Sequence, residues 1–401
     1  MADFRMKPPT PETTPVPRVL RPRRAAPADA VRPTRAEVSL EALRHNLRVL
    51  RRITNAPIYS VLKADAYGHG AKAVARTLER AGANGVCVAL LEEAIELREA
   101  GIMCPIVVMG GYYGKAWTEL IHYQLTPVIY DLSQLEALSR EASHEQGQPW
   151  EIHLKVDTGM GRLGISPHLL GRALDLLAAR PELNVQGLMT HLACADTSVE
   201  SIDAQLDLFD QARETLKSRG IVPHLRHAAN SAAIIRSPRA HLDLVRPGIA
   251  LFGVDPGSTP TLNLRPVMRV LSQIVALRQL SPGDSVGYGA TWSATKPSTI
   301  ATVPIGYADG LSRAASNNGE VLVRGKRAPI VGAVSMDLTT VDVTGIEGAH
   351  VGDEVVLLGK QQGPLGEDSI SANEIAAREN TIAWEVLTNI SRRVPRFYRE
   401  S

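Results

Sequence analysis

Short apolar runs alternate with amphipathic helical patterns through the first two thirds of the chain. Four leucines recur on one face behind a capping Ser39, which predicts a helix over residues 39–53. Beyond it, apolar runs return at intervals of about 25 residues, as they do in βα units. The predicted strands cover residues 58–62, 85–90, 105–109, 126–130, 151–156, 185–189, 224–228 and 242–245, and the predicted helices between them cover 71–81, 91–100, 132–141, 167–179 and 204–219.

Eight strand-then-helix repeats predict a closed (β/α)8 barrel of the TIM type, which takes about 250 residues. An open doubly wound sheet is the alternative, although it rarely needs eight units. From residue 268 the pattern changes to short alternating runs separated by Gly and Pro, which predicts an antiparallel β domain. Its runs cover residues 269–277, 299–303, 320–323, 339–343 and 354–358, followed by one helix over 371–381.

The predicted fold class is therefore α/β, with an N-terminal (β/α)8 barrel over residues 36–267 and a C-terminal, mostly antiparallel β domain over 268–401. The stretch 253–266 is rich in Pro and Gly, as linkers often are. Residues 1–35 are rich in Pro and Arg and have no apolar segment of a secretory signal, so we interpret them as a disordered arm.

Charge and cysteine content narrow the function classes. The 44 Lys and Arg residues against 42 Asp and Glu residues give a formal net charge of +2, which offers no electrostatic case for nucleic acid or a membrane surface. No run is long enough to span a bilayer. The three cysteines are far apart with no C-x-x-C, so we expect neither a zinc site of the usual spacing nor a disulfide framework, and a reducing cytoplasm fits best.

Polar side chains follow several predicted barrel strands, where the active site of this fold lies. Lys63 ends the first strand, and a lysine there can form a Schiff base with an aldehyde cofactor. An ordinary strand-end lysine in contact with water is the alternative. Tyr67 follows just beyond the first strand, and the ends of later strands carry Lys155, Arg162, His191, Asn230, Ser231, Arg246, Gly248 and Ile249.

An anion site is expected beside the amine. Phosphate sites in this fold are often built by the loops after strands seven and eight, which here carry Ser231 and the turn Gly248-Ile249. Ser231 can also cap the helix that follows it. An amine facing a phosphate site is the pair that pyridoxal phosphate needs.

The string Gly159-x-Gly161-x-x-Gly164 matches the dinucleotide fingerprint. It falls at the fifth repeat, however, and no clear acidic residue follows at the expected distance. We therefore interpret the glycines as room for close approach of the backbone to a ligand, with Arg162 pointing inward.

Several runs together resemble the alanine racemase family, in order and across both predicted domains from residue 36 to 401. They are VLKADAYGHG at 61–70, KVDTGMGRLG at 155–164, TH at 190–191, NSAA at 230–233, RPGIALFG at 246–253, VGYGATW at 286–292, PIGYADG at 304–310 and VSMD at 334–337. The resemblance implies pyridoxal 5'-phosphate, a homodimer, and interconversion of L- and D-alanine, either to supply peptidoglycan synthesis or to break alanine down.

The resemblance also implies a role for each matching residue. Lys63 would hold the cofactor as an internal aldimine and act as one acid/base group, and Tyr288 from the partner subunit would act on the opposite face. Arg246 would face the pyridine nitrogen, and His191 would stand between it and the tyrosine. The phosphate would be held by Tyr67, Ser231, Gly248 and Ile249, and Asn230 would also bind the cofactor. Arg162 and the Met336 N–H would bind the substrate carboxylate or the phenolic oxygen of the cofactor. Lys155, Tyr307 and Asp337 would support the site, and Lys155 is a carbamate in some family members.

Physical chemistry agrees with these roles. Racemisation removes the Cα proton from one side and replaces it from the other, so two bases are expected. A tyrosine, whose ordinary pKa is near 10, needs nearby positive charge to act as a base at neutral pH. Arginine cannot accept a proton from the pyridine nitrogen, so the ring stays a weaker electron sink and simple proton exchange is favoured.

One position departs from the family pattern. Many relatives have tyrosine just before the RVPR segment, where this chain has Arg392. An arginine can pair with phosphate or alter the substrate entrance, so the sequence leaves a strict alanine enzyme and a broader one open.

Three other readings compete. A pyridoxal-phosphate decarboxylase of this barrel class would want an acidic partner where Arg246 stands. A cofactor-binding barrel without catalysis would lack the β domain that carries Tyr288. An unrelated barrel hydrolase leaves Lys63, Tyr288 and Arg246 unexplained.

Overall fold

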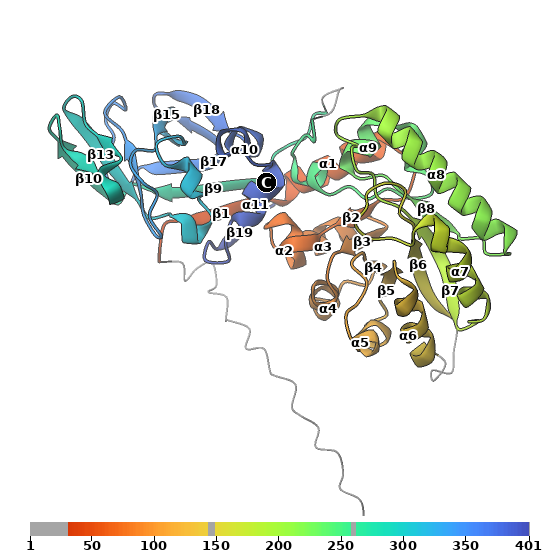
Figure 1. Ribbon diagram of the computed structural model, residues 1–401. Helices are drawn as coiled ribbons and strands as arrows, with labels where there is room; N and C mark the ends of the chain where they lie inside the picture. The colour runs from red at the N-terminus through yellow and green to blue at the C-terminus, as the bar shows by residue number, and fades with distance from the viewer. Residues whose placement is uncertain (1–30, 143–148, 258–261, 401) are drawn as a thin grey trace, which may run out of the picture.

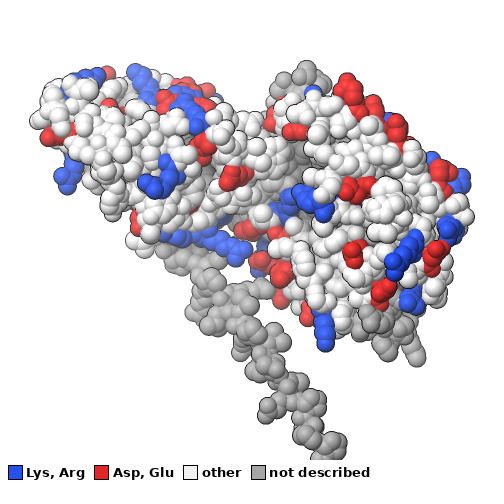
Figure 2. All heavy atoms as spheres, viewed as in Figure 1, with Lys and Arg blue, Asp and Glu red and all other residues white. Residues whose placement is uncertain are grey.

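The computed structural model describes residues 31–142, 149–257 and 262–400 and shows two lobes side by side (Figure 1). One lobe is a parallel barrel surrounded by helices, and the other is built mainly from antiparallel strands. Lys and Arg are interspersed with Asp and Glu over the face in Figure 2, and the surface is hollowed between the lobes. Among the described residues, no helix combines the length and apolar character that crossing a bilayer requires.

The barrel contains seven parallel strands in chain order, each neighbour hydrogen-bonded to the next. Their residues are mostly buried and apolar, as expected where helices cover a parallel sheet. The strands are β2 (Tyr59–Val61), β3 (Gly85–Val88), β4 (Ile106–Val108), β5 (Thr126–Ile129), β6 (Trp150–Lys155), β7 (Leu183–Met189) and β8 (Leu225–His227).

The segment 243–247 closes the barrel between β8 and β2. The Asp243 N–H donates to the Arg226 carbonyl at 3.0 Å, and the Tyr59 N–H donates to the Val245 carbonyl at 2.9 Å. The Val61 N–H donates to Pro247 at 2.8 Å. The predicted eighth strand is thus present as a short backbone ladder, and the closed barrel is confirmed over the open sheet.

The barrel helices match the predicted segments to within a few residues. Ser39 caps α1 by accepting a hydrogen bond from the Ala42 N–H at 3.1 Å. Helix α5 was not predicted because it has only 6 residues, too few for a periodic pattern. Helix α9, also of 6 residues, is the helix expected at Ser231. The helices are α1 (Leu40–Ile53), α3 (Ala71–Arg80), α4 (Leu91–Glu99), α5 (Trp117–His122), α6 (Leu132–Ala142), α7 (Pro167–Ala178), α8 (Val199–Ser218) and α9 (Ser231–Arg236).

The β domain contains a large sheet in the order β15-β14-β17-β9-β1-β19, with β18 paired to β17, and a smaller sheet in the order β10-β13-β16. The run predicted over 269–277 divides between these two sheets. The strands are β9 (Met268–Gln273), β10 (Ala276–Leu280), β11 (Ser285–Val286), β12 (Trp292–Ser293), β13 (Ser298–Val303), β14 (Glu320–Val323), β15 (Lys326–Pro329), β16 (Thr339–Asp342), β17 (Glu354–Gly363), β18 (Gly366–Ile370) and β19 (Arg396–Arg399).

Two helices stand where the sequence predicted one. Helix α10 (Ala372–Glu379) ends at Asn380, whose φ of 53° is left-handed, and α11 (Ala383–Asn389) follows in a new direction. Asparagine tolerates this conformation better than most residues, so it terminates the helix inside the predicted range.

The first strand, β1 (Arg35–Ser39), was not predicted. It lies between β9 and β19 in the sheet of the β domain, although the sequence analysis placed residues 36–39 at the start of the barrel. Residues 31–35, assigned to the end of a disordered arm, are also ordered: Arg32 donates two hydrogen bonds to the buried Asp309 at 2.7 and 2.9 Å. The five-residue strand is too short to stand out beside a Pro- and Arg-rich segment. Residues 1–30 of the predicted arm lie outside the described residues.

A left-handed turn connects β2 to α3. In α2 (Lys63–Tyr67) the φ angles of Ala64 to Tyr67 are 53–55°, a conformation that costs about 1–2 kcal/mol for each such residue. Local hydrogen bonds offset the cost: the Gly68 N–H donates to the Ala64 carbonyl at 2.9 Å, and the Asp65 carboxylate accepts from the Ala71 N–H at 2.8 Å. The turn therefore presents Lys63 and Tyr67 on a rigid backbone.

The β domain of the same chain packs directly on this turn, at the junction of the lobes in Figure 1. A Cβ atom on Gly68 would lie 2.4 Å from the Leu387 carbonyl oxygen of α11. Arg396 of β19 donates from Nε to the Gly68 carbonyl at 2.9 Å. Glycine is required at residue 68 both by its φ of 78° and by this close approach.

We expect Gly68→Ala to lower the thermal midpoint and to destabilise the protein by more than about 1 kcal/mol, because the new Cβ meets backbone that cannot move aside. Gly171→Ala is the matched control: residue 171 lies inside α7 with open space around it, so alanine should stabilise by about 0.5–1 kcal/mol. Thermal and urea unfolding measure both. Equal effects of the two substitutions would contradict the packing described.

Candidate active site

The basic residues predicted for the barrel mouth lie close enough to influence one another. Burial lowers the pKa of Lys63, the charge of Arg162 lowers it further, and Glu93 opposes both. Lys63 remains accessible to solvent, so it lies at the surface of the barrel end rather than in the core. Burial, then the charges of Arg246 and Arg162, lowers the pKa of Lys155 to about 8.

His191 lies close enough to the same basic residues to be influenced by their positive charge. Burial lowers its pKa to about 3, together with the charges of Arg246, Lys155, Arg162 and Lys63 in that order. The imidazole is therefore neutral at physiological pH, and it adds no further positive charge to the mouth.

Arg246 is buried at the end of the closing segment, with 3% of its surface exposed. Its Nη2 donates to the carbonyls of Thr190 at 2.9 Å and Ala228 at 3.1 Å, and its Nη1 donates to His227 Nδ1 at 2.5 Å. All three acceptors are neutral. Burial lowers the pKa of Arg246 to about 10, and the side chain remains a cation near pH 7.

Ser231 joins the loops after strands seven and eight. Its Oγ accepts from the Gly248 N–H at 2.9 Å and the Ala250 N–H at 3.3 Å. The predicted capping role belongs instead to Asn230, whose side-chain oxygen accepts from the Ala233 N–H at 3.0 Å. Asn230 precedes the first helical residue, which is the position where a side chain can reach the free N–H groups.

The hydroxyl of Tyr67 reaches the Gly248 turn, to which Ser231 also bonds. A Cβ on Gly248 would lie 2.3 Å from this hydroxyl, so only glycine allows the approach. The Tyr67 ring packs against Phe252 with ring centroids 5.0 Å apart, and Ile249, which follows Gly248, is buried. A tyrosine hydroxyl and a serine hydroxyl thus meet at the Gly248 turn, and both can donate a hydrogen bond to a phosphate.

The glycine-rich run after β6 is not a phosphate loop. The Asp157 carboxylate accepts from the N–H groups of Gly159, Met160 and Gly161 at 3.0, 2.9 and 3.0 Å. Burial acts to raise the pKa of Asp157, but these backbone bonds outweigh it and the pKa is lowered. The N–H groups that would bind a nucleotide phosphate are already occupied by this internal anion, in agreement with the expectation against a nucleotide site.

The remaining predicted residues lie on the β domain and face solvent. Tyr288 is 76% exposed, Met336 51% and Tyr307 42%, and Asp337 pairs with Arg393 at 2.6 Å. Tyr307 and Met336 are neighbours because the Tyr307 and Ala308 N–H groups donate to the Ser335 and Met336 carbonyls. The single chain therefore does not bury these side chains in the mouth. Exposed large side chains that lie next to one another, as Tyr307 and Met336 do, are typical of an interaction surface.

Two features of the mouth were missed by the sequence analysis. Glu93, in α4, accepts from the Ala64 N–H at 2.5 Å and from the Ala89 N–H at 2.9 Å, and so ties the left-handed turn to the end of β3. The buried His227 and His153 lie beneath Arg246. A histidine at an otherwise apolar strand position was the only available signal for the second feature.

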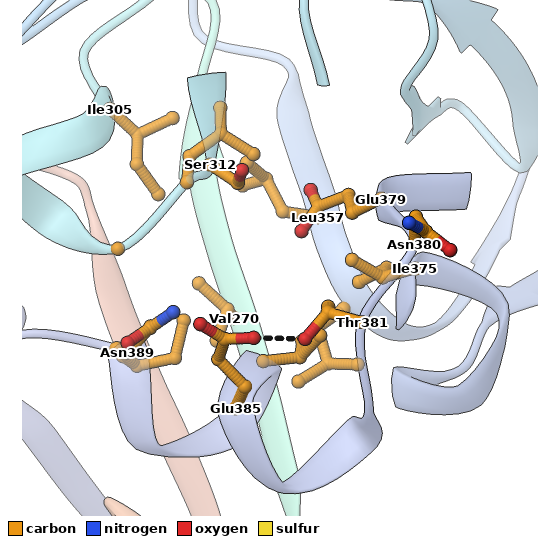
Figure 3. A pocket seen from close by; sticks show the side chains of 15 residues that line it. Val270, Ile305, Ser312, Leu357, Ile375, Glu379, Asn380, Thr381, Glu385 and Asn389 are labelled. Atoms are coloured by element: carbon orange, nitrogen blue, oxygen red, sulfur yellow. Dashed lines mark hydrogen bonds between the residues drawn. The ribbon is translucent and has the colours of Figure 1, made fainter. Parts of the chain in front are cut away.

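A separate pocket lies in the β domain, between its large sheet and helices α10 and α11 (Figure 3). The Thr381 hydroxyl donates to Glu385 at its rim, and burial and the nearby Glu385 charge raise the pKa of Glu379. None of the predicted site residues lines this pocket. We interpret it as a packing gap beneath the two helices rather than the site of chemistry.

The fold and the site together define a class of protein: a closed parallel barrel with an appended β domain. The ends of its barrel strands carry an amine, Lys63, a buried arginine, Arg246, and an anion cradle, by which we mean the hydroxyls of Tyr67 and Ser231 at the Gly248 turn. Family models match both parts, the N-terminal domain of alanine racemase over residues 38–256 and its C-terminal domain over 267–398.

Individual relatives agree with the family models. Alanine racemase of Sorangium cellulosum is 60% identical over 378 residues, covering 92% of this chain and 100% of the relative. Alanine racemase from Streptomyces coelicolor A3(2) superposes with a TM-score of 0.86 at 38% identity, covering 93% of this chain and 100% of that one. The alanine racemase from Bacillus anthracis with bound L-Ala-P superposes with a TM-score of 0.84 at 33% identity, covering 92% of this chain and 95% of that one. The chain belongs to the alanine racemase family.

The depressed pKa of Lys155 makes stability depend on pH. The unfolded amine has its ordinary pKa of 10.5, so between about pH 8 and 10.5 the unfolded chain binds more protons and the free energy of unfolding rises with pH. We expect Lys155→Met to raise that free energy at pH 7 by up to about 3 kcal/mol and to flatten the rise. Urea denaturation across this range measures both.

Lys115→Met, at an exposed lysine, is the control and should change stability by less than about 0.5 kcal/mol at any pH. A Lys155→Met protein that is no more stable than the wild type at pH 7, or whose free energy of unfolding rises with pH as steeply, would contradict the expectation. Burial of the Lys155 amine would then not destabilise the protein.

Proposed function

We propose that this protein is a pyridoxal-phosphate-dependent racemase that interconverts L- and D-alanine. The observation that carries the proposal is the placement of Lys63, an accessible amine of lowered pKa on a rigid left-handed turn, in one mouth with the buried cation Arg246. Membership in the alanine racemase family supports the same reaction.

The residues of the mouth fit pyridoxal phosphate. Lys63 Nζ would hold the aldehyde carbon, and Tyr67, Ser231, Gly248 and Ile249, with Asn230 fixing the helix start, would hold the phosphate. Among the described residues, three of the five N–H groups of Arg246 have acceptors, so two remain for the pyridine nitrogen. When bound, the cofactor supplies electron withdrawal from the substrate Cα.

Two protein groups would move the Cα proton. Lys63 accepts or returns it on one face, and its lowered pKa keeps more of the free amine near neutral pH than an ordinary lysine has. Tyr288 of a second copy of the chain acts on the other face, because in a single chain this residue is exposed on the β domain. His191, neutral beside Arg246, stands between the arginine and the tyrosine.

The same second copy completes the substrate site. Arg162 at the mouth and the Met336 N–H from the partner copy would bind the substrate carboxylate or the phenolic oxygen of the cofactor. Tyr307 and Asp337 support the Met336 loop, and Lys155 supports Arg162, as a carbamate if its amine of pKa about 8 reacts with carbon dioxide. The proposed assembly is a homodimer with two shared sites.

Arg392 is proposed to border the entrance. It is exposed, and its loop is anchored by Arg396, which donates to the carbonyls of Ser391 and Ile390 at 2.5 Å as well as to Gly68. The loop is therefore fixed against the turn that carries Lys63. Three free cysteines in the described chain support a reducing, cytoplasmic setting.

Covalent capture tests the cofactor. The purified protein incubated with pyridoxal phosphate should be yellow, and borohydride should fix the cofactor on the peptide that contains Lys63, as read by mass spectrometry. Lys63→Ala should take up no covalent label, whereas Lys115→Ala should label like the wild type. A colourless protein, or a label on another lysine, would overturn the proposed role of Lys63.

A hybrid-dimer experiment tests the shared site. Lys63→Ala and Tyr288→Phe should each be nearly inactive in alanine racemisation. If both proteins are mixed, dissociated and reassociated, about half the dimers are hybrids with one intact site of two, so about a quarter of wild-type activity should return. No recovery from well-mixed dimers would mean that Lys63 and Tyr288 of one chain serve the same site.

A further inference from the structure

A line of hydrogen bonds runs down the barrel interior from Arg246. Arg246 Nη1 lies 2.5 Å from His227 Nδ1 on β8, and His227 Nε2 lies 2.9 Å from His153 Nδ1 on β6. His153 Nε2 lies 3.1 Å from Gln186 Oε1 on β7, and Gln186 Nε2 donates to the carboxylate of Glu151 near the start of β6. The line thus joins the active-site end of the barrel to its opposite, solvent-exposed end.

The chemistry of its two ends sets the direction of every bond. Arginine only donates, so His227 Nδ1 has to accept, and a neutral His227 then carries its proton on Nε2 and donates to His153. His153 in turn accepts at Nδ1 and donates from Nε2 to the amide oxygen of Gln186. A carboxylate only accepts, so the Gln186 amide nitrogen faces Glu151, which is the orientation that leaves its oxygen for His153.

The surroundings keep both rings neutral. His153 and His227 are 0% and 1% exposed. Burial lowers the pKa of His153 to about 4 and that of His227 well below its ordinary value, with the Arg246 charge acting in the same direction on both. A second proton on either ring would also leave two donors facing each other or facing the arginine.

Local backbone features support the line. Ile152 pairs with Val185 and His153 with Gly187, so Gln186 is an extra residue in β7 and the register shifts there. Such a bulge redirects a side chain. Gly187 provides the space for the imidazole, because a Cβ there would lie 2.5 Å from the His153 ring.

We propose that Glu151, Gln186, His153 and His227 form a one-directional hydrogen-bonded line that positions Arg246. His227 is the positioning residue in contact with the guanidinium: as a fixed acceptor it holds Arg246 charged and aimed so that its remaining N–H groups face the mouth. The link to the cofactor ring rests on the proposed function, but the direction of the line does not.

Nuclear magnetic resonance tests the direction without any cofactor. In cofactor-free protein with ¹⁵N-labelled histidine, the rings of His153 and His227, assigned by their loss in His153→Gln and His227→Gln, should both be neutral with the proton on Nε2. This state should persist between about pH 6 and 8. A proton on Nδ1, or a charged ring, at either residue would overturn the proposal even if the protein is a racemase.

The holoenzyme tests the positioning. His227→Leu removes the acceptor and should lower kcat for alanine about tenfold or more, change KM less, and shift the pH titration of the bound cofactor's visible absorbance. His227→Gln, which keeps a side-chain oxygen as acceptor, should recover part of each effect. Gly187→Ala should displace His153 and so change kcat and the absorbance titration in the same direction as His227→Leu, but by less. Gly171→Ala is the control and should leave kcat and the spectrum unchanged.

The contrary results are also distinct. If His227→Leu lowers only the thermal midpoint and leaves the absorbance titration and kcat as in the wild type, the line is structural and the positioning role is wrong. If the wild-type protein binds no pyridoxal phosphate, the proposed function fails while the ring protonation states still decide the direction of the line.

Discussion

The left-handed turn at the end of β2 is the constraint on which the active site depends. Four consecutive residues without glycine adopt a conformation that each disfavours, and the turn persists because Glu93, Asp65 and the neighbouring carbonyls satisfy its backbone groups. The β domain adds a second brace through α11 and Arg396. The position of Lys63 is therefore set by contacts with both lobes rather than by the barrel alone.

Positive charge is concentrated at the barrel mouth, where the charges of Glu93 and Asp157 oppose it only in part. Burial lowers the pKa of both lysines, the charge of Arg162 lowers that of Lys63 further, and the charges of Arg246 and Arg162 lower that of Lys155 further. The bonds made by Arg246 all go to neutral acceptors. Such a mouth attracts anions and keeps amines available in the free form. The phosphate of a cofactor and the carboxylate of an amino acid are the groups that would balance this charge.

In the proposed function, the single chain presents two incomplete halves of one site. The barrel supplies the amine and the anion cradle, and the β domain displays Tyr288, Tyr307 and Met336 to solvent. Tyr307 and Met336 lie next to each other there, and contiguous exposed apolar side chains mark interaction surfaces. Assembly of two copies would cover this surface and bring the second base to the lysine, which makes dimerisation part of the proposed mechanism and not only of stability.

The sequence by itself determined the barrel, the appended β domain and the residues at the strand ends, because periodicity and strand-end placement are local properties that the chain displays directly. It missed β1, whose partners lie more than 200 residues away, and the break at Asn380, where one residue's backbone preference overrides a helical pattern. It also gave Ser231 a capping role that Asn230 fills.

Only the tertiary structure decided what Asp157, Glu93 and the paired histidines do. A glycine-rich run can bind phosphate only if its N–H groups are not already bonded within the protein. Here the Asp157 carboxylate accepts hydrogen bonds from them. The directed bonds beneath Arg246 depend on β6, β7 and β8 bringing His153, Gln186 and His227 together inside one barrel. Such contacts are set by packing between distant segments, and no local pattern in the chain encodes them.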